Sequence, residues 1–343
     1  MIIYTYKSYH KNVLYIYRQN PFKLELRKGW GNFMIVKVNN LVKRYNELLA
    51  LDHLNLEVKE GEIFGLLGPN GSGKSTAINC ILSLLKYDKG EISIFDKPMG
   101  PDAYDIKKDL GVVMQDVAVF EELTVYENID YFCGLYITDK LKKKALVEEA
   151  IEFVALNDFK KFYPKKLSGG LLRRLNIACG IAHKPRLLIL DEPTVAVDPQ
   201  SRNNILSGIK KLNQNGTTII YTTHYMEEVE QLCDRIAILD KGRTVALGTK
   251  EELKAMIKIG EKITVEIFNL SPSVLDKIRE LSTVAKAEYR ENTLVIRSTK
   301  GKNNIVRIIE FLNDNKIEFG KIYSELPTLN DVFLEITGKE LRD

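Results

Sequence analysis

The sequence predicts an α/β protein with a mostly parallel sheet, followed by a smaller α+β unit. Strands and helices alternate from Met34 to about residue 245, which is typical of a parallel sheet covered by helices. From residue 261 the pattern changes to strand, helix, two strands, helix and strand, the order of the ferredoxin-like arrangement. With 343 residues, the chain is long enough for two domains.

The chain begins with a segment whose composition differs from the rest. Residues 1–33 contain six Lys or Arg and one Glu, a surplus of +5, so the other 310 residues sum to −1 of the net charge of +4. The segment lacks the apolar core and cleavage site of a signal peptide. We interpret 1–33 as a basic and aromatic appendage and hypothesise a mis-assigned start upstream of Met34. The near-neutral remainder gives no support to nucleic-acid binding, and no nucleic-acid partner is expected.

The elements of the first unit follow from short apolar runs. Strands are predicted at 35–38, 54–68 and 187–190, and a helix at 76–85. The second unit is predicted to contain a strand at 261–268, a helix at 271–284, strands at 287–290 and 293–298, a helix at 303–315, a strand at 317–326 and a Pro-initiated helix at 327–338. The boundary falls near 250–260, which gives domains at 34–252 and 260–343. The second unit shows no catalytic constellation, so we expect an accessory or dimerisation domain.

Neither a membrane span nor a cysteine-based site is expected. The longest apolar runs, IFGLLG at 63–68 and LLIL at 187–190, are far shorter than the ~18 residues that cross a bilayer. The cysteines are far apart and form no CxxC pair, which argues against a metal site or a disulfide framework and favours a reducing cytosol. They are Cys80, Cys133, Cys179 and Cys233.

A glycine-rich loop predicts nucleotide binding. The stretch GPNGSGKST matches G-x-x-x-x-G-K-[ST] between a predicted strand and a predicted helix, the context that the motif requires. Glycines let backbone N–H groups converge on phosphate oxygens, and the helix adds its positive end. Lys74 is expected at the β- and γ-phosphates, Ser75 at Mg²⁺ and Thr76 at the α-phosphate. The predicted loop residues are Gly68, Pro69, Asn70, Gly71, Ser72, Gly73, Lys74, Ser75 and Thr76.

An acidic pair supplies the second half of the predicted site. The buried strand at 187–190 ends in Asp191 and Glu192, at the edge of the sheet where open α/β proteins bind ligands. Asp191 is the candidate for the Mg²⁺ shell. Glu192 is the candidate general base for the attacking water.

A second phosphate cradle is predicted at LSGGL, residues 167–171, where Ser-Gly-Gly opens an apolar-periodic run. Leu171 is in helical register with Leu175, Ala178 and Ala182, so we expect its side chain to pack. One chain therefore carries two cradles for anions.

These motifs together resemble the ATP-binding subunit of an ABC transporter over about residues 34–250. The family signature LSGGQ is matched at Leu167, Ser168, Gly169 and Gly170 and departs at Leu171. Other positions match the family's aromatic that stacks on adenine, its Q-loop glutamine, its D-loop aspartate and its switch histidine; these are Tyr45, Gln115, Asp198 and His224.

The resemblance implies a fold, a chemistry and partners. The fold is a P-loop NTPase cassette with a mostly parallel sheet core, an antiparallel β subdomain and a helical subdomain. The cofactors are ATP and Mg²⁺, with Glu192, His224 and Gln115 catalytic and with Ser75, Gln115 and Asp191 around the metal, the last partly through water. Two cassettes pair head to tail, and each ATP lies between the loop of one and the signature of the other.

The family also implies a second cassette and an integral membrane permease as partners, at the cytoplasmic face of the membrane. Lys74 and Ser168 are only 94 residues apart, which excludes the long coiled coil of DNA-repair relatives. The ending PTLNDVFLEITGKELRD resembles the multidrug-export type, similar to daunorubicin and antibiotic exporters. The alternative is a cassette ATPase that works as a mechanical module without a membrane partner. A small-molecule kinase does not account for Ser168–Gly170 or His224.

Overall fold

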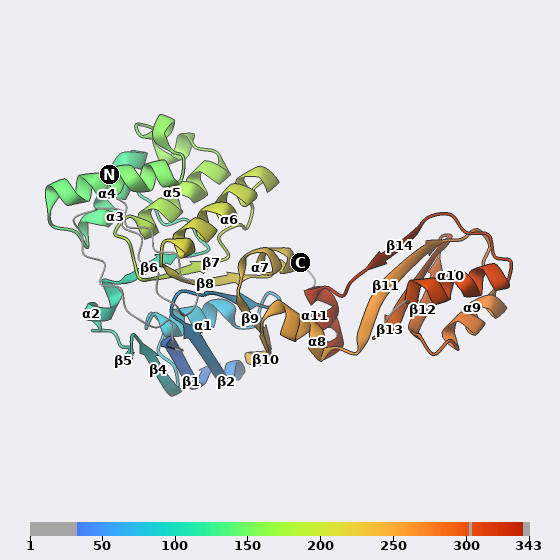
Figure 1. Ribbon diagram of the computed structural model, residues 1–343. Helices are drawn as coiled ribbons and strands as arrows, with labels where there is room; N and C mark the ends of the chain where they lie inside the picture. Colours follow the sequence, from blue (N-terminus) through green and yellow to red (C-terminus); the bar gives the residue numbers. More distant parts are fainter. Residues whose placement is uncertain (1–32, 302–303, 339–343) are drawn as a thin grey trace, which may run out of the picture. The chain divides into compact units, whose positions relative to one another are not determined.

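The computed structural model describes residues 33–301 and 304–338 (Figure 1). The predicted appendage at 1–33 lies outside the described residues, apart from Phe33. The strands are β1 (Met34–Tyr45), β2 (Leu48–Lys59), β3 (Ile63–Leu67), β4 (Lys89–Ile94), β5 (Lys97–Pro98), β6 (Leu110–Val113), β7 (Leu187–Asp191), β8 (Thr218–Thr223), β9 (Arg235–Asp240), β10 (Arg243–Gly248), β11 (Ile259–Glu266), β12 (Val284–Arg290), β13 (Thr293–Thr299) and β14 (Ile322–Glu325). The helices are α1 (Lys74–Ile81), α2 (Tyr104–Lys107), α3 (Val125–Gly134), α4 (Lys140–Phe153), α5 (Gly169–Ile181), α6 (Pro199–Gln214), α7 (Met226–Leu232), α8 (Lys250–Met256), α9 (Pro272–Arg279), α10 (Asn304–Asp314) and α11 (Leu329–Thr337), with short 3₁₀ turns at Asn157–Phe159 and Pro164–Lys166.

A six-stranded sheet in the order β10-β9-β3-β8-β7-β6 forms the centre of the larger unit. The pairs from β9 to β6 are parallel, and only the edge strand β10 is antiparallel. The strands β3, β7 and β8 are buried at every residue, as expected for a parallel sheet covered on both faces. This confirms the predicted α/β core.

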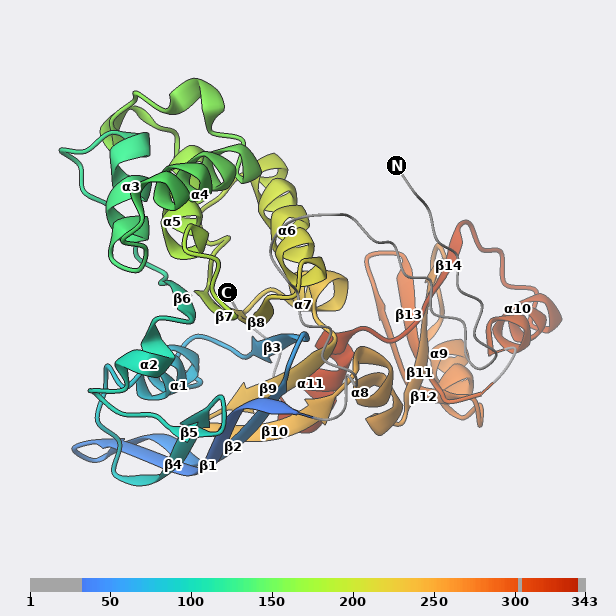
Figure 2. The same cartoon turned by 60° about the vertical axis from the view of Figure 1, so that its left-hand side comes forward.

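Alternate residues of each central strand face two different hydrophobic cores. On β7, Leu188 and Leu190 join the core formed with α3, α4, α5 and α6, whereas Leu187 and Ile189 join the core formed with α1. The α1 core also takes in the antiparallel sheet β2-β1-β4-β5. The antiparallel β subdomain and the helical region around α3 and α4 are therefore present, on opposite sides of the central sheet (Figure 2).

The smaller unit is an antiparallel sheet in the order β12-β13-β11-β14 with α9 and α10 (Figure 1). Its elements follow each other as the sequence predicts, although β14 is shorter than the predicted strand at 317–326. Its core holds Ile263, Val265, Ile296, Ile308 and Leu312 and is separate from the other two. The ferredoxin-like assignment of this unit stays a prediction.

The last described helix, α11, packs with the larger unit instead. Leu329, Val332 and Phe333 are buried in the core that contains α5, α6 and α7. Glu230 on α7 accepts a hydrogen bond from the Leu329 N–H at 2.8 Å. The predicted domain at 260–343 therefore includes α11, although the apolar face of α11 packs into the core of the larger unit.

No helix within 33–301 and 304–338 has the length and apolar character to cross a bilayer. The four cysteines are all buried and unpaired, and burial raises the pKa of the Cys80 thiol to about 11. All four therefore lie in the interior as small packing residues.

Candidate functional site

A cleft of about 590 Å³ collects most of the predicted nucleotide residues. It is lined by Tyr45, Leu48, Leu49, Ala50, Asn70, Gly71, Gly73, Lys74, Ser75, Thr76, Gln115, Glu192 and Lys241. The lining residues come from the β1–β2 hairpin, the glycine-rich loop with the start of α1, the ends of β6 and β7, and the β9–β10 turn. Segments far apart in the sequence therefore meet at the carboxyl edge of the parallel sheet, as the motifs predict.

The glycine-rich loop joins β3 to α1 and needs glycine at its last turn. Gly73 caps α1 with a φ of 105°, and a Cβ there would lie 2.8 Å from the Ala50 carbonyl oxygen. Lys74 follows at the first residue of α1 and is 4% exposed. Its ammonium donates to the carbonyl oxygens of Gly68 at 2.8 Å and Pro69 at 3.3 Å. These bonds fold the side chain back over the loop, where a phosphate chain would lie.

Glu192 lies where three predicted motifs meet. Its Oε1 is 3.1 Å from the Lys74 ammonium, and its Oε2 is 3.2 Å from Nδ1 of His224. The residue is 5% exposed and has a φ of 46°, a left-handed conformation that costs a non-glycine residue about 1–2 kcal/mol. Such strain often marks a functional position. The carboxylate is thus held between the Lys74 ammonium and the His224 ring.

Asp191 lies one residue earlier, at the end of β7, and is 1% exposed. Its Oδ1 accepts a hydrogen bond from the Thr222 hydroxyl on β8, and the Glu192 N–H donates to the same hydroxyl oxygen at 3.0 Å. Thr222 thereby holds both members of the acidic pair. The threonine was not among the predicted site residues, because a single Thr in an apolar strand carries no sequence signal.

Arg173 is a further residue that the motifs did not reveal. It lies on α5, four per cent exposed, and donates to the carbonyl oxygens of Met114 at 2.9 Å, Gln115 at 2.9 Å and Glu192 at 3.0 Å. Burial lowers the pKa of its guanidinium. The side chain joins α5 to the backbone of Gln115 and of the candidate base Glu192. The sequence signal that could have revealed Arg173 is its charge at a position where the helical period of α5 predicts burial.

The second cradle begins α5. Ser168 is its N-cap and accepts a hydrogen bond from the Leu171 N–H at 3.4 Å. The Leu171 side chain packs, partly buried, against the core, which confirms its predicted packing role. At Gly170, a Cβ would overlap the Ser201 hydroxyl and approach Asp198 Oδ2 to 3.3 Å, so only glycine lets α5 come this close to α6.

Asp198 is the N-cap of α6 and accepts a hydrogen bond from the Ser201 N–H at 2.9 Å, which lowers the pKa of its carboxyl group. Like Leu167, Ser168, Gly169 and Gly170, it does not line the cleft. Five other predicted residues do not line the cleft either, but each neighbours a lining residue in the sequence or contacts one. They are Gly68, Pro69, Ser72, Asp191 and His224. The structure thus separates the second cradle from the first.

The end of the cleft where adenine stacking is predicted contains residues that sequence reasoning found only in part. Tyr45 was predicted; its ring is 44% exposed and has the Lys43 ammonium 5.1 Å from its centroid. Leu48, Leu49 and Ala50, next to it on β2, and Lys241 from the β9–β10 turn were not predicted. An exposed aromatic beside apolar residues is suited to stacking on a planar base.

The residues that would hold a divalent cation fit Mg²⁺. Ser75 and Gln115 line the cleft, and Asp191, next to the lining residue Glu192 in the sequence, accepts a hydrogen bond from the Thr222 hydroxyl. Within the part of the chain that the structure describes, no group of three or more His, Cys, Asp or Glu could hold a metal. A site with few protein carboxylates suits Mg²⁺, which takes its remaining ligands from water and substrate phosphates.

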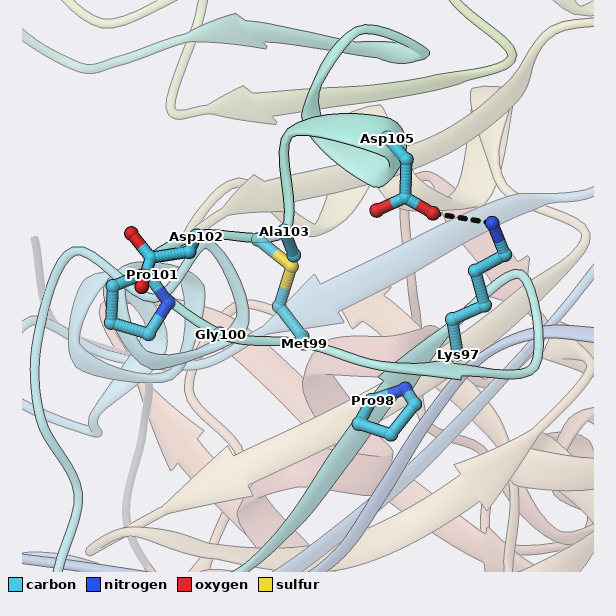
Figure 3. Close-up of a pocket in the computed structure, with 8 residues that line it drawn as sticks. All are labelled: Lys97, Pro98, Met99, Gly100, Pro101, Asp102, Ala103 and Asp105. Carbon is cyan, nitrogen blue, oxygen red and sulfur yellow. Dashed lines mark hydrogen bonds and ion pairs between the residues drawn. The ribbon is translucent and has the colours of Figure 1, made fainter.

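A separate cleft of about 490 Å³ lies beside β5 and α2 (Figure 3). Its lining runs from Lys97 to Asp105, and the picture shows the ion pair between these two side chains. Both are more than half exposed. None of the motif residues lies there, so this cleft is not the nucleotide site.

Known proteins resemble the chain in sequence and in fold. The family model described as "ABC transporter" matches residues 51–195. The linearmycin resistance ATP-binding protein LnrL of Bacillus subtilis (strain 168) is 37% identical over 90% of this chain and 100% of its own length. The daunorubicin resistance ATP-binding protein DrrA3 of Streptomyces coeruleorubidus is 34% identical, over 90% and 97%. The Nod factor export ATP-binding protein I of Burkholderia orbicola (strain AU 1054) is 36% identical, over 90% and 98%.

Solved structures match the larger unit. The ATP-binding cassette MJ0796, described as a dimeric post-hydrolysis state bound to ADP and phosphate, superposes with a TM-score of 0.58 at 30% identity, over 62% of this chain and 98% of its own. The structure of cbiO1 from Clostridium perfringens, part of an ABC transporter complex, gives a TM-score of 0.60 at 29% identity, over 65% and 91%.

Proposed function

The chain belongs to the ABC transporter family as an ATP-binding subunit, and we propose that it powers export through a separate membrane subunit by hydrolysing Mg·ATP between two cassettes. The observation that carries the two-cassette part is the position of the second cradle. Ser168 and Gly169 are exposed and line no part of the cleft that contains Lys74 and Glu192. A second copy that turns its Ser168 toward this cleft would complete the site, and two such sites would form at once.

The proposed roles follow from the contacts. The backbone N–H groups of the glycine-rich loop and the Lys74 ammonium bind the phosphate chain, and Tyr45 stacks on the adenine. Glu192 accepts a proton from the attacking water, and His224 holds the Glu192 carboxylate in place through its Nδ1. The partner's Ser168 and glycine N–H groups would donate to the γ-phosphate, where charge develops. Ser75, Gln115 and Asp191 would hold Mg²⁺, which neutralises charge on the β- and γ-phosphate oxygens when bound.

Export and the membrane partner are proposed from the relatives. Three of them are named for drug resistance or Nod factor export, and the chain covers nearly the whole length of each. By this reading the chain works at the cytoplasmic face of a membrane, attached to a permease that carries the transported compound. Fractionation with membranes, and recovery of a polytopic subunit in the same complex, separate this function from that of a mechanical module without a membrane partner.

Glu192→Gln tests the hydrolytic site. The amide keeps the shape of the side chain but accepts no proton from water, so we expect turnover to fall about 100-fold or more while ATP still binds. ATP then accumulates between two copies, and the variant elutes as a dimer in ATP but not in ADP during gel filtration. Glu227→Gln, an exposed change on α7, is the matched control and should behave as wild type. Unchanged turnover in Glu192→Gln would remove Glu192 as the base, and a monomer in ATP would remove the shared site.

A further inference from the structure

Glu228, on α7, is a buried carboxylate to which the mechanism assigns no role. It is 2% exposed. Its Oε1 accepts a hydrogen bond from the Thr194 hydroxyl at 2.6 Å, and its Oε2 accepts from the hydroxyls of Tyr221 and Thr223, each at 2.8 Å. The Nε of Arg202 lies 3.6 Å from Oε1. One side chain on α7 therefore joins the turn after Glu192, the first turn of α6 and the end of β8.

Two of these segments carry the candidate catalytic groups. Thr194 lies two residues after Glu192, in the turn that leads to Asp198 and α6. Thr223 directly precedes His224, and its hydroxyl oxygen also accepts a hydrogen bond from the Tyr225 N–H at 3.0 Å. Glu228 thus holds the chain on either side of the contact between Glu192 and His224.

Arg202 is linked to the same histidine through Tyr225. Its guanidinium lies over the ring of Tyr225, 4.6 Å from the centroid, and the Tyr225 ring lies 4.1 Å from the ring of His224. Arg202 belongs to α6, the helix that Asp198 caps. The Glu228 carboxylate therefore connects the D-loop helix, the turn after Glu192 and the switch histidine in one set of contacts.

A charge in such a place is not needed for stability. Burying a carboxylate carries a desolvation cost of several kcal/mol, which hydrogen bonds and a nearby cation only offset, and an apolar side chain of similar size often serves stability equally well. What the carboxylate adds is direction, because its two oxygens fix the positions of three hydroxyls. Burial and the Glu228 charge raise the pKa of Tyr221 well above its usual value, so that hydroxyl stays protonated and remains a donor.

We propose that Glu228 is a positioning residue for ATP hydrolysis, which holds the Thr194 turn and Thr223 in the register that brings Glu192 and His224 together at the γ-phosphate. This rests on the proposed function, because it takes Glu192 as the base. Loss of the carboxylate then lowers kcat and leaves nucleotide binding intact, since neither Lys74 nor the glycine-rich loop touches Glu228. A merely structural role would instead lower activity and binding together, in proportion to the folded fraction.

The test compares Glu228→Leu and Glu228→Gln with Glu227→Gln, the exposed neighbour on the same helix. In the full-length chain we expect Glu228→Leu to lower kcat about 10- to 100-fold, the size of effect that a small misplacement of a reacting group causes. KM and the Kd for ATP should stay within about two-fold of wild type. Glu228→Gln keeps one acceptor oxygen, so its kcat should lie between those of Glu228→Leu and wild type. Glu227→Gln should match wild type in every measurement.

Thr223→Val tests the same contact independently, because it leaves the Glu228 carboxylate unchanged. It removes one donor to Glu228 and keeps the size of the side chain, so it should lower kcat in the same direction and leave ATP binding unchanged. The double variant Glu228→Leu/Thr223→Val should lose less than the product of the two single losses, because both act through one contact. If Glu228→Leu does not fold, Glu228→Gln and Thr223→Val carry the test by themselves.

Two results overturn the proposal. One is a kcat within about two-fold of wild type in folded Glu228→Leu or, failing that, in both Glu228→Gln and Thr223→Val. The other is a parallel loss of kcat and ATP affinity. The two proposals also fail differently. If turnover depends on Glu192 but not on Glu228, only the positioning role fails; if turnover is independent of Glu192, the proposed site itself fails and the positioning role with it.

Discussion

At the scale of single residues, the site depends on side chains that no nucleotide motif contains. Glu192 keeps a left-handed backbone only because its surroundings hold it there: Thr222 binds its N–H, and Arg173 binds its carbonyl oxygen. Each of these bonds is buried, where losing one partner leaves a polar group that costs about 1–3 kcal/mol. The acidic pair is therefore positioned from its backbone as much as through its carboxylates.

Arg173→Lys should separate these backbone contacts from the charge. A lysine keeps the cation, but its single ammonium cannot reach the carbonyl oxygens of Met114, Gln115 and Glu192 together. We expect the free energy of unfolding to fall by about 1–3 kcal/mol and kcat to fall more than KM changes. Arg174→Lys is the matched control, because Arg174 donates to the carbonyl oxygens of Val154 and Ala155 instead. Chemical denaturation and steady-state ATPase kinetics measure both effects; equal kinetics in the two variants would contradict the role of Arg173.

At the scale of elements, the sequence predicts structures that form from adjacent residues, but it does not predict which distant elements pack together. The buried strand at 187–190, the loop before α1 and the Ser168 cap of α5 all follow from a few adjacent residues, and the central sheet appears as predicted. The apolar face of α11 has the right helical period, but periodicity does not say which core it joins. The same limit hid Glu228, whose partners are two hydroxyls from β8, one from the turn after Glu192 and a guanidinium from α6.

The start of α11 gives a pH-dependent prediction. Burial opposes the charge of Asp331, but hydrogen bonds from Thr328 and from the Arg297 guanidinium outweigh it, so the pKa of this carboxyl is lowered. A lowered pKa stabilises the fold above the unfolded value of about 3.9, and this contribution is lost as pH falls through the folded value. Wild type should therefore melt above Asp331→Asn at pH 7, by a gap that stays constant to about pH 5 and narrows below it. Thermal unfolding across this range measures the gap, and a gap that widens in acid would contradict the assignment.

At the scale of the whole molecule, the last described helix joins two units. Its apolar residues Leu329, Val332 and Phe333 lie in the cassette core, whereas Asp331 on the same helix pairs with Arg297 on β13 of the smaller sheet. Glu230, two residues after the buried Glu228 on α7, binds both the Leu329 N–H and the Lys254 ammonium of α8. The cassette is thus completed by a segment that follows the smaller unit in the sequence, and α7 contacts both this segment and Thr223, next to His224.

Phe333→Ala tests whether the cassette depends on this returning helix. Phe333 is 2% exposed, and removing a buried phenylalanine costs about 3–5 kcal/mol through lost burial and the cavity left behind. We expect this loss in the cassette's own unfolding transition, which is identified as the transition that ATP shifts to higher temperature. Phe268→Ala is the matched control, since Phe268, two residues after β11, is 65% exposed and its loss should change stability by no more than about 0.5 kcal/mol. If Phe333→Ala weakens only a transition that ATP does not shift, α11 belongs to the smaller unit and the cassette core closes without it.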